Sequence, residues 1–516
     1  MSGVKSLVAL TVLVAAGLAP SVVGAAPGEL DRSFGTGGTA TVPLAGTLVA
    51  DVGIDADGRI VVGGSSGDLS RRAFTLLRLL SSGQLDPSFG TGGVVRALDD
   101  DSGFTGLKAI VPLRDGGLVA AGDTKQGMGV LRVDDSGQTV WVRHHQLGRP
   151  YAFPNRPDVV SAGARVTHAA LVGDKIMVSG SASRGGTTNH FDPMLARLNV
   201  SDGSLDRSFG EEGRLIAPRP AGKQNCFISY TWFISFVVRA DGSIVAGGIA
   251  DCTGNQETAP AVLRAYTTSG EPVAGFETDP IAATSLRWLR AGPDTTLTAV
   301  GRGVTGEVVL MRFTSSGALA GEPVPLGPPG AAAPVVFVAQ PDERLVGPSG
   351  ANAMRFLPDG SLDESFGRAG QASIGHGAQS IALQSDGRIV VAGQRAPDDA
   401  FAISRLLGGM RAGVPSVRAR RASVQRRRVS IPIACGPRGA STCRGTVKIT
   451  ATGRRHTSFA RARTFNVTAG KQRTLRLTLN STARRRIALA PRHRLTVRLA
   501  ITAGGRTTQR RLVLTT

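Results

Sequence analysis

Near its N-terminus the chain reads GELDRSFGTGG (residues 28–38), and close copies of this stretch recur farther along. They read GQLDPSFGTGG (83–93), GSLDRSFGEEG (203–213) and GSLDESFGRAG (360–370). Each copy combines an Asp suited to an Asx-type turn, glycines that allow tight backbone, and a Phe that can pack between neighbouring units. The first copy has no repeat body before it, so it needs a partner elsewhere in the chain.

A second signature lies between these copies. It is a polar turn followed by a short β-rich run that ends in Gly. The clear examples are DGRIVVGG (57–64), DGGLVAAG (115–122), DGSIVAGG (241–248) and DGRIVVAG (386–393), and the weaker ones are GDKIMVSG (173–180), PDTTLTAVG (293–301) and PDERLVG (341–347). This pattern predicts a β-hairpin in each of seven repeats.

Each hairpin is followed by a strand-like segment that carries an arginine. These arginines are Arg78, Arg132, Arg197, Arg264, Arg312, Arg355 and Arg405. A period of roughly 50 residues, made of short strands separated by Gly and Asp turns, is typical of propeller blades rather than solenoids. No window shows an apolar period of 3.6 residues, which argues against alternating strands and helices.

The seventh repeat ends at AISRLLGGM (402–410) without an LDxSFG copy of its own. The N-terminus supplies one such copy and an outer strand, GTATVPL (38–44), with no body before it. We therefore predict that residues 38–44 pair with the strand around 401–407, which leaves no open edge in the ring. The predicted fold class is all-β: a seven-bladed β-propeller closed by the N-terminal strand, followed by a small basic β-sandwich.

The combination of DG-(K/R)-IVVAG, an Arg-bearing strand and DG-x-LD-x-SFG resembles the delta-60 repeat family of bacterial secreted and surface proteins. The resemblance covers residues 28–409 and implies a β-propeller-like fold, and it brings no catalytic residues. We expect the recurring Asp and Phe residues to be structural, with turn capping favoured over metal binding because each copy offers one carboxylate. These residues are Asp31, Phe34, Asp86, Phe89, Asp206, Phe209, Asp363 and Phe366.

Residues 1–25 have the pattern of a secretory signal peptide. Lys5 gives the positive n-region, LVALTVLVAAGLA (7–19) the apolar region, and Val23-Gly24-Ala25 a small-residue cleavage site. We expect a secreted or cell-surface protein with no transmembrane segment, because no later apolar run approaches the roughly 18 residues that span a bilayer. The expected domains are a propeller (26–409), a basic linker (410–428) and a basic β-sandwich (429–516).

Basic residues are concentrated at the C-terminus. The chain has 60 Lys+Arg and 38 Asp+Glu, and residues 410–516 hold 26 of the basic residues and none of the acidic ones. Beyond residue 428 apolar residues alternate with polar ones, as in Val429, Ile431 and Ile433, which predicts antiparallel strands with arginines on the outer face. This part resembles the immunoglobulin-like tail modules of exported actinobacterial proteins.

The four cysteines form two pairs that are close in sequence. Cys226 is paired with Cys252, and Cys435 is paired with Cys443. In an exported chain such pairs predict disulfides, and the absence of CxxC spacing argues against a structural metal.

No catalytic motif is recognisable in the sequence. His144-His145 lies in a degenerate repeat and is expected in a solvated loop. We therefore assign no catalytic, cofactor-binding or metal-binding residue, and expect no cofactor.

Two hypotheses about function stay open. The first is an exported non-enzymatic scaffold or binding protein, monomeric, whose residues 410–516 adhere to an anionic cell-wall polymer or polysaccharide. Sequence-specific nucleic-acid binding is not expected, because Phe459 and Phe465 are the only aromatics of this part and no helix is predicted. The alternative is a propeller hydrolase or lyase acting on extracellular glycans or small molecules. Converging carboxylates, histidines or a metal at the propeller axis would favour the enzyme.

Overall fold

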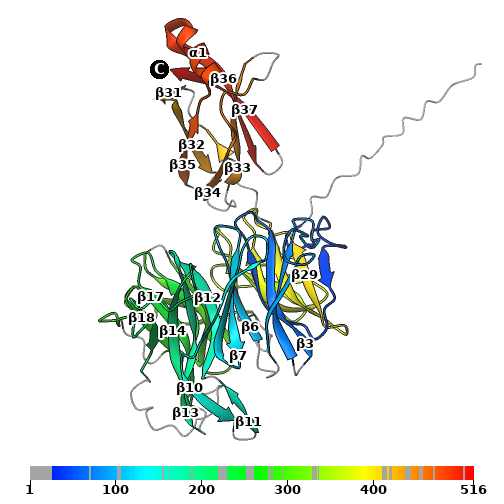
Figure 1. The fold of residues 1–516 in the computed structure, drawn as a ribbon, viewed down its shortest axis with the longest axis vertical. Helices are drawn as coiled ribbons and strands as arrows, with labels where there is room; N and C mark the ends of the chain where they lie inside the picture. Colours follow the sequence, from blue (N-terminus) through cyan, green and yellow to red (C-terminus); the bar gives the residue numbers. More distant parts are fainter. Residues whose placement is uncertain are drawn as a thin grey trace, which may run out of the picture.

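The computed structural model describes residues 26–409 and 415–515, with gaps (Figure 1). The gaps are 69–70, 101–105, 154–155, 162, 187–189, 219–228, 252–260, 277–280, 282, 293, 328–333, 335, 410–414, 418–420, 436–442, 453–456, 469–470 and 504–505. The predicted signal peptide (1–25) lies outside the described residues. Cys226 and Cys252, which the sequence predicts to be joined by a disulfide, also lie outside them.

Within the described residues, the chain from β1 to β29 forms seven blades arranged as a propeller. Blade 1 contains β2 (Leu48–Ile54), β3 (Ile60–Asp68), β4 (Arg71–Leu79) and β5 (Val94–Asp100). Blade 2 contains β6 (Gly106–Pro112), β7 (Leu118–Thr124), β8 (Gly127–Val133) and β9 (Thr139–His145). Blade 3 contains β12 (Ala164–Val172), β13 (Lys175–Gly186), β14 (His190–Asn199) and β15 (Arg214–Ile216).

The remaining blades continue the same antiparallel order. Blade 4 contains β16 (Ser229–Val238), β17 (Ile244–Asp251) and β18 (Ala261–Tyr266). Blade 5 contains β19 (Ser285–Ala291), β20 (Leu297–Arg302), β21 (Val308–Phe313) and β22 (Val324–Pro325). Blade 6 contains β23 (Val338–Ala339), β24 (Leu345–Ser349), β25 (Asn352–Phe356) and β26 (Gln371–Ser373). Blade 7 contains β27 (Gly377–Leu383), β28 (Ile389–Arg395), β29 (Ala400–Leu406) and β1 (Thr39–Val42).

The Asp-Gly turns form the hairpins that the sequence predicts. Between β2 and β3, the Asp55 carboxylate accepts hydrogen bonds from the amides of Asp57 and Arg59, both at 2.9 Å. Gly58 has a φ of +87°, which glycine adopts without a steric penalty. The next strand, β3, is buried on both faces from Ile60 to Ser66, because neighbouring blades cover it on either side.

The N-terminal strand closes the ring, as predicted. β1 pairs antiparallel with β29, with Thr39 opposite Ser404 and Val42 opposite Phe401. In Figure 1 the blue N-terminal segment lies beside the yellow strand β29. Blade 7 is thus built from both ends of the propeller sequence, and closure buries Phe34, Val62, Leu77 and Ile403 in one cluster between blades 7 and 1.

Blade 3 carries an extra hairpin made of β10 (Arg149–Phe153) and β11 (Arg156–Ser161). β10 pairs parallel with β13 of blade 3, and the hairpin lies at the end of the propeller away from the C-terminal domain (Figure 1). Blades 3 and 4 are also joined by a short parallel contact between β14 and β16, which merges them into one sheet.

The C-terminal domain is an eight-stranded, nearly closed barrel sheet. Its strands are β30 (Pro415–Ser416), β31 (Arg421–Gln425), β32 (Arg428–Cys435), β33 (Cys443–Ala451), β34 (Arg463–Val467), β35 (Gln472–Thr478), β36 (Arg494–Ala503) and β37 (Arg506–Thr515). An isolated bridge between Ala460 and Leu479 brings the two ends of the sheet together. Val429, Ile431 and Ile433 point into the core, as their alternation predicts.

The strands form two groups, as the predicted β-sandwich requires: β30, β32 and β35 pair with one another, and β33, β34, β36 and β37 pair with one another. β31 pairs with both β32 and β37 and joins the two groups into the nearly closed barrel. The domain differs from the prediction in two respects. Part of the expected linker 410–428 lies in the sheet: β30 pairs with β32, and β31 pairs with β37. A helix, α1 (Ser481–Leu489), follows β35 and precedes a 3-10 turn at Pro491–His493.

Candidate functional site

The repeat motif builds a recurring cluster that we name the arginine clamp: the strand arginine with the Asp, Ser and Phe of LDxSFG. In blade 1, Arg78 Nε donates to Asp86 Oδ2 at 2.8 Å, and its guanidinium lies 4.5 Å from the centre of the Phe89 ring. Arg78 Nη2 donates to Ser88 Oγ at 3.1 Å, while Ser88 donates back to Asp86 Oδ1 at 2.7 Å. Arg78 is 1% exposed and Phe89 is 0% exposed, so the clamp is a buried ion pair under an aromatic ring.

Three further blades contain the same clamp. In blade 3, Arg197 pairs with Asp206 at 2.8 Å and lies 4.9 Å from the Phe209 ring. In blade 6, Arg355 pairs with Asp363 at 2.9 Å and lies 4.5 Å from the Phe366 ring. In blade 7, Arg405 pairs with Asp31 at 2.9 Å and lies 4.6 Å from the Phe34 ring. This last clamp joins residues from the two ends of the propeller.

Each clamp also connects its blade to the next one. Arg78 Nη1 donates to the Asp135 carbonyl of blade 2 at 2.5 Å, and the Gly90 amide donates to the Ser136 carbonyl at 2.8 Å. Gly90 has a φ of +55°, and a Cβ there would meet Val94 O at 2.3 Å. Only glycine therefore allows this close approach. The eight Asp and Phe residues singled out in the sequence serve packing between blades.

The hairpin turns supply each clamp aspartate with a second cation. The pairs are Arg59 with Asp86 at 3.8 Å, Lys175 with Asp206 at 3.8 Å, Arg344 with Asp363 at 3.0 Å and Arg388 with Asp31 at 2.7 Å. Burial opposes ionisation of Asp86, but the hydrogen bonds from Ser88 and the charge of Arg78 outweigh it and lower the pKa of that carboxyl. The pKa values of Asp31, Asp206 and Asp363 are lowered by the same balance.

Sequence reasoning found the arginines and the aspartates but not their pairing. The signal was the nearly constant separation, eight residues from Arg78 to Asp86 and from Arg355 to Asp363, and nine from Arg197 to Asp206. Arg264 lies on a strand, β18, as the sequence predicts, but it is not at the clamp position. In blade 4, Val245 pairs with Ala265, whereas Val61 of blade 1 pairs with Arg78, so Arg264 is one residue out of register.

Blade 4 compensates with a different arginine. Arg239, from the turn after β16, lies 5.4 Å from the Phe276 ring and donates to the Ser315 carbonyl of blade 5 at 2.6 Å. A guanidinium over a phenyl ring at the blade boundary is therefore retained even where LDxSFG has decayed.

Two half-buried titratable groups, Asp51 and His168, lie on the first strands of blades 1 and 3. The Asp51 carboxylate accepts hydrogen bonds from the Ile110 amide and the Ser380 hydroxyl, both at 3.0 Å, and thereby links blade 1 to blades 2 and 7. Burial raises the pKa of Asp51 to about 6. His168 in blade 3 packs 5.2 Å from the Phe236 ring, and burial lowers its pKa to about 4. Among the described residues, no group of three or more His, Cys, Asp or Glu is placed to hold a metal ion.

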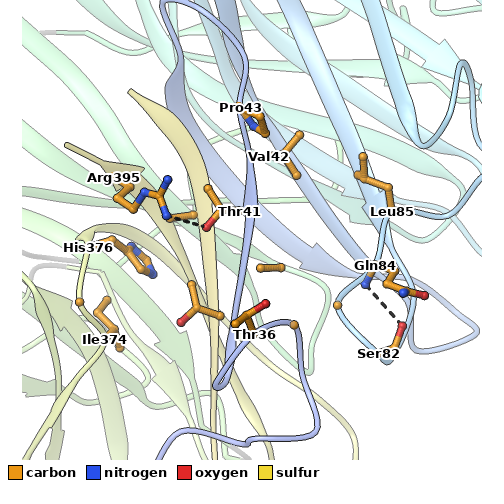
Figure 2. Close-up of a pocket in the computed structure, with 16 residues that line it drawn as sticks. Thr36, Thr41, Val42, Pro43, Ser82, Gln84, Leu85, Ile374, His376 and Arg395 are labelled. Carbon is orange, nitrogen blue, oxygen red and sulfur yellow. Dashed lines mark hydrogen bonds between the residues drawn. The ribbon is translucent and has the colours of Figure 1, made fainter. Parts of the chain in front are cut away.

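A cavity of about 1100 Å³ lies along the closing strand β1 (Figure 2). Figure 2 shows Thr41 between His376 and Arg395 on one side and the turn with Gln84 on the other. The polar groups of this cavity are largely engaged within the protein. His376 Nε2 is 3.0 Å from Ser404 Oγ, and Arg395 Nη2 donates to Asp398 at 2.6 Å. We therefore regard the cavity as a consequence of ring closure.

The C-terminal domain has a cavity of about 1030 Å³ that we name the arginine groove, after Arg444, Arg463, Arg473 and Arg476, which line it. Residues of β32, β33, β34 and β35 line it, together with Ala56 and Asp57 of the propeller. Arg463 Nη1 donates to the Arg476 carbonyl at 2.6 Å. The acidic residue among those lining the groove, Asp57, belongs to the propeller. Residues 410–516 contain no Asp or Glu, so these guanidinium groups receive no carboxylate from their own domain.

The two predicted disulfides have different outcomes. Cys435 and Cys443 form the disulfide that the sequence predicts, with Cα atoms 5.5 Å apart. Cys226 and Cys252 both fall in segments that the structure does not describe, residues 219–228 and 252–260. The disulfide between Cys226 and Cys252 is therefore not confirmed and stays a prediction.

The predicted histidine and aromatic residues also have mixed outcomes. His144 and His145 lie on β9 and not in a loop, and His145 Nε2 is 2.9 Å from the Gly203 carbonyl. Phe459 and Phe465 are 1% and 3% exposed, so neither offers a stacking surface. No helix in the described part of the chain is long and apolar enough to cross a membrane.

These observations define a class: a closed seven-bladed β-propeller followed by a basic, barrel-like domain. Residues 56–89 and 174–209 match the family model described as a domain of unknown function (DUF5122) beta-propeller. Both segments run from a hairpin turn into an arginine clamp, in blades 1 and 3. No curated protein sequence matches the chain.

Several solved structures are similar to the chain at low identity. A gluconolactonase from Xanthomonas campestris shares 14% identity over 73% of this chain and 94% of its own, with a TM-score of 0.35. The polysaccharide lyase Uly1 shares 10% identity over 73% of this chain and 93% of its own, with a TM-score of 0.42. The WD40 domain of Toxoplasma gondii coronin shares 10% identity over 72% of this chain and 84% of its own, with a TM-score of 0.38. Similarity at this level says nothing about what the chain binds or transforms.

Proposed function

We propose that this protein is an exported, non-enzymatic propeller scaffold of the delta-60 repeat type, whose arginine-rich C-terminal domain adheres to an anionic cell-wall polymer or polysaccharide. The observation that carries the proposal is the arginine groove, four arginines around one cavity in a domain without a single acidic residue. The signal-like segment 1–25 and the Cys435–Cys443 disulfide support export, because disulfides persist mainly in oxidising compartments.

The chemistry of the groove favours charge over shape as the basis of recognition. Guanidinium groups bind carboxylate, phosphate and sulfate with paired hydrogen bonds. Both aromatic side chains of the domain are buried, so base or sugar stacking has no exposed platform. An extended polyanion could occupy the groove and continue beyond its ends.

The test compares two full-length variants with the same loss of charge. One replaces Arg444, Arg463, Arg473 and Arg476 with Gln, and the control replaces the exposed Arg484, Arg485, Arg494 and Arg511 with Gln. Binding to purified cell walls that contain teichoic acid is measured by co-sedimentation at rising salt. We expect the groove variant to lose at least about tenfold more affinity than the control, because paired hydrogen bonds add to the general charge term.

Two results would count against the proposal. If the unmodified protein does not bind even at low salt, adhesion is wrong. If both variants lose affinity equally, adhesion stands but the groove is not its site. Circular dichroism and thermal unfolding of both variants show whether the barrel remains folded.

A further inference from the structure

Blade 5 lacks the acidic half of its arginine clamp. Its arginine is in register, because Thr298 pairs with Arg312 as Val61 pairs with Arg78 in blade 1. The amide of Ala320 donates to the Arg312 carbonyl at 2.7 Å, just as the amide of Asp86 donates to the Arg78 carbonyl at 2.8 Å. Ala320 therefore occupies the backbone position of the clamp aspartate.

The segment that supplies the phenyl ring is also missing. Val324 of the outer strand pairs with Leu310, and its counterpart Val95 pairs with Leu76 in blade 1. Val324 lies 12 residues after Arg312, whereas Val95 lies 17 residues after Arg78. The connection in blade 5 is thus five residues shorter, and it turns into the outer strand before a Ser-Phe-Gly segment could follow.

Arg312 keeps one clamp contact and loses the others. It donates to the Pro358 carbonyl of blade 6, which corresponds to the contact of Arg78 with Asp135. Among the described residues, Arg312 forms no ion pair within 4.0 Å and no aromatic ring lies beneath its guanidinium, and the acidic neighbour that senses its charge is the exposed Asp359 of blade 6. Arg312 is exposed, in contrast to Arg78 and Arg355, which are both 1% exposed.

A cavity of about 460 Å³ opens at this place between blades 5 and 6. Arg312 and Ala320 line it, together with a second cation, Arg290 of β19. Leu310 and Leu345, from the cluster between blades 5 and 6, supply its apolar wall, and the lining also includes Thr296, Thr298, Thr314 and Ser315. The acidic residue in the lining is Glu343, which the two arginines outnumber.

We propose that this cavity binds a small molecule that combines a carboxylate with a flat apolar body of about the size of a phenyl ring. The carboxylate would take the place of the absent clamp aspartate at Arg312, and the apolar body would take the place of the absent phenylalanine. The four complete clamps show this pair of groups bound to an arginine in the same register. The volume is in the range of small-molecule sites. The site lies in the propeller and is independent of adhesion by the C-terminal domain.

The test uses the full chain and three probes: phenylacetate, the neutral phenylacetamide, and acetate, which lacks the apolar body. Calorimetry and ligand-observed NMR give the affinities. We expect phenylacetate to bind with a dissociation constant in the millimolar range or tighter, and each of the other probes to bind at least about tenfold more weakly.

Variants locate the binding. Arg312→Gln should reduce phenylacetate affinity by at least about tenfold. Ala320→Asp should do the same, because it places a carboxylate of the chain at Arg312. Glu343→Gln should tighten binding by removing a repulsive charge. The control, Arg207→Gln, changes an exposed arginine in blade 3 and should leave the affinity unchanged.

Three outcomes would overturn the proposal. They are no saturable binding of phenylacetate up to about 10 mM, equal affinity for phenylacetamide, and an unchanged affinity in the Ala320→Asp variant. Thermal unfolding of each variant separates lost binding from lost folding.

Discussion

At the scale of single residues, the arginine clamp explains why the LDxSFG motif has its composition. Asp86 neutralises Arg78, Ser88 holds the carboxylate in place, and Phe89 covers the guanidinium. Fully burying a Phe side chain contributes about 1.5–3 kcal/mol. The arginine and the aspartate of a clamp depend on each other, because an unpaired buried charge costs far more folding free energy than a paired one.

Arg78 and Arg312 occupy the same register position in their blades, but their substitution should change the free energy of unfolding by very different amounts. Arg78→Ala leaves the buried Asp86 with only the more distant Arg59, 3.8 Å away, and should lower the free energy of unfolding by up to about 3–5 kcal/mol. Arg312→Ala, the matched control in blade 5, removes an exposed side chain and should change it by less than about 0.5 kcal/mol. Urea unfolding followed by fluorescence measures both. Equal losses would show that the clamp contributes nothing beyond a surface arginine.

The clamp aspartates also predict how stability depends on pH. Their pKa values are lowered in the folded protein, so their contribution is complete above the unfolded value of about 4 and is lost as the pH falls through the folded values. The free energy of unfolding should therefore fall below about pH 4, and Asp86→Asn should weaken this dependence.

Asp51 works in the opposite direction and serves as the control. Burial raises its pKa to about 6, so its ionisation destabilises the fold as the pH rises from about 4 to 6. Asp51→Asn should remove that decline and leave the fall in the free energy of unfolding below about pH 4 unchanged. Unfolding measured from pH 3 to 7 separates the two effects. If Asp86→Asn left the fall in the free energy of unfolding below about pH 4 unchanged, the role given to the clamps would be contradicted.

At the scale of elements, the sequence was most informative where a motif could be counted. The unmatched LDxSFG at the N-terminus and the missing copy after Leu407 predicted the pairing of β1 with β29.

The helix α1 could not be found from periodicity, because its buried residues, Ala483 and Ile487, form too short a pattern. The available signal was local: the Asn480 side chain caps the helix and Pro491 follows it. The blade 5 cavity could not be foreseen, because it depends on strand register.

Ring closure can be tested with a disulfide between the paired strands. Thr39 lies opposite Ser404, and their hydroxyl oxygens are 2.8 Å apart. The double variant Thr39→Cys/Ser404→Cys should therefore form a disulfide on oxidation and raise the melting temperature, because the bond closes a very long loop of the unfolded chain. Thiol titration and non-reducing electrophoresis after proteolysis detect the bond. Two free thiols that stay reduced under oxidising conditions in the folded protein would contradict the β1–β29 pairing.

At the scale of the whole molecule, charge divides the chain into two parts. Before residue 410 there are 34 basic and 38 acidic residues, and the arginines of the propeller are largely used in clamps and turns. After it there are 26 basic residues and no acidic ones. The positive electrostatic field of these residues attracts anionic polymers, and salt screens that attraction. The chain thus joins a closed propeller ring to a polycationic domain.

The most direct measurement compares residues 26–516 with residues 26–409 alone, as binding to cell walls across a salt series from about 20 to 500 mM. We predict that residues 26–516 bind at low salt, that the logarithm of their affinity falls linearly with the logarithm of the salt concentration, and that the isolated propeller does not bind. Equal binding by the two proteins, or binding by residues 26–516 that does not change with salt, would contradict this prediction.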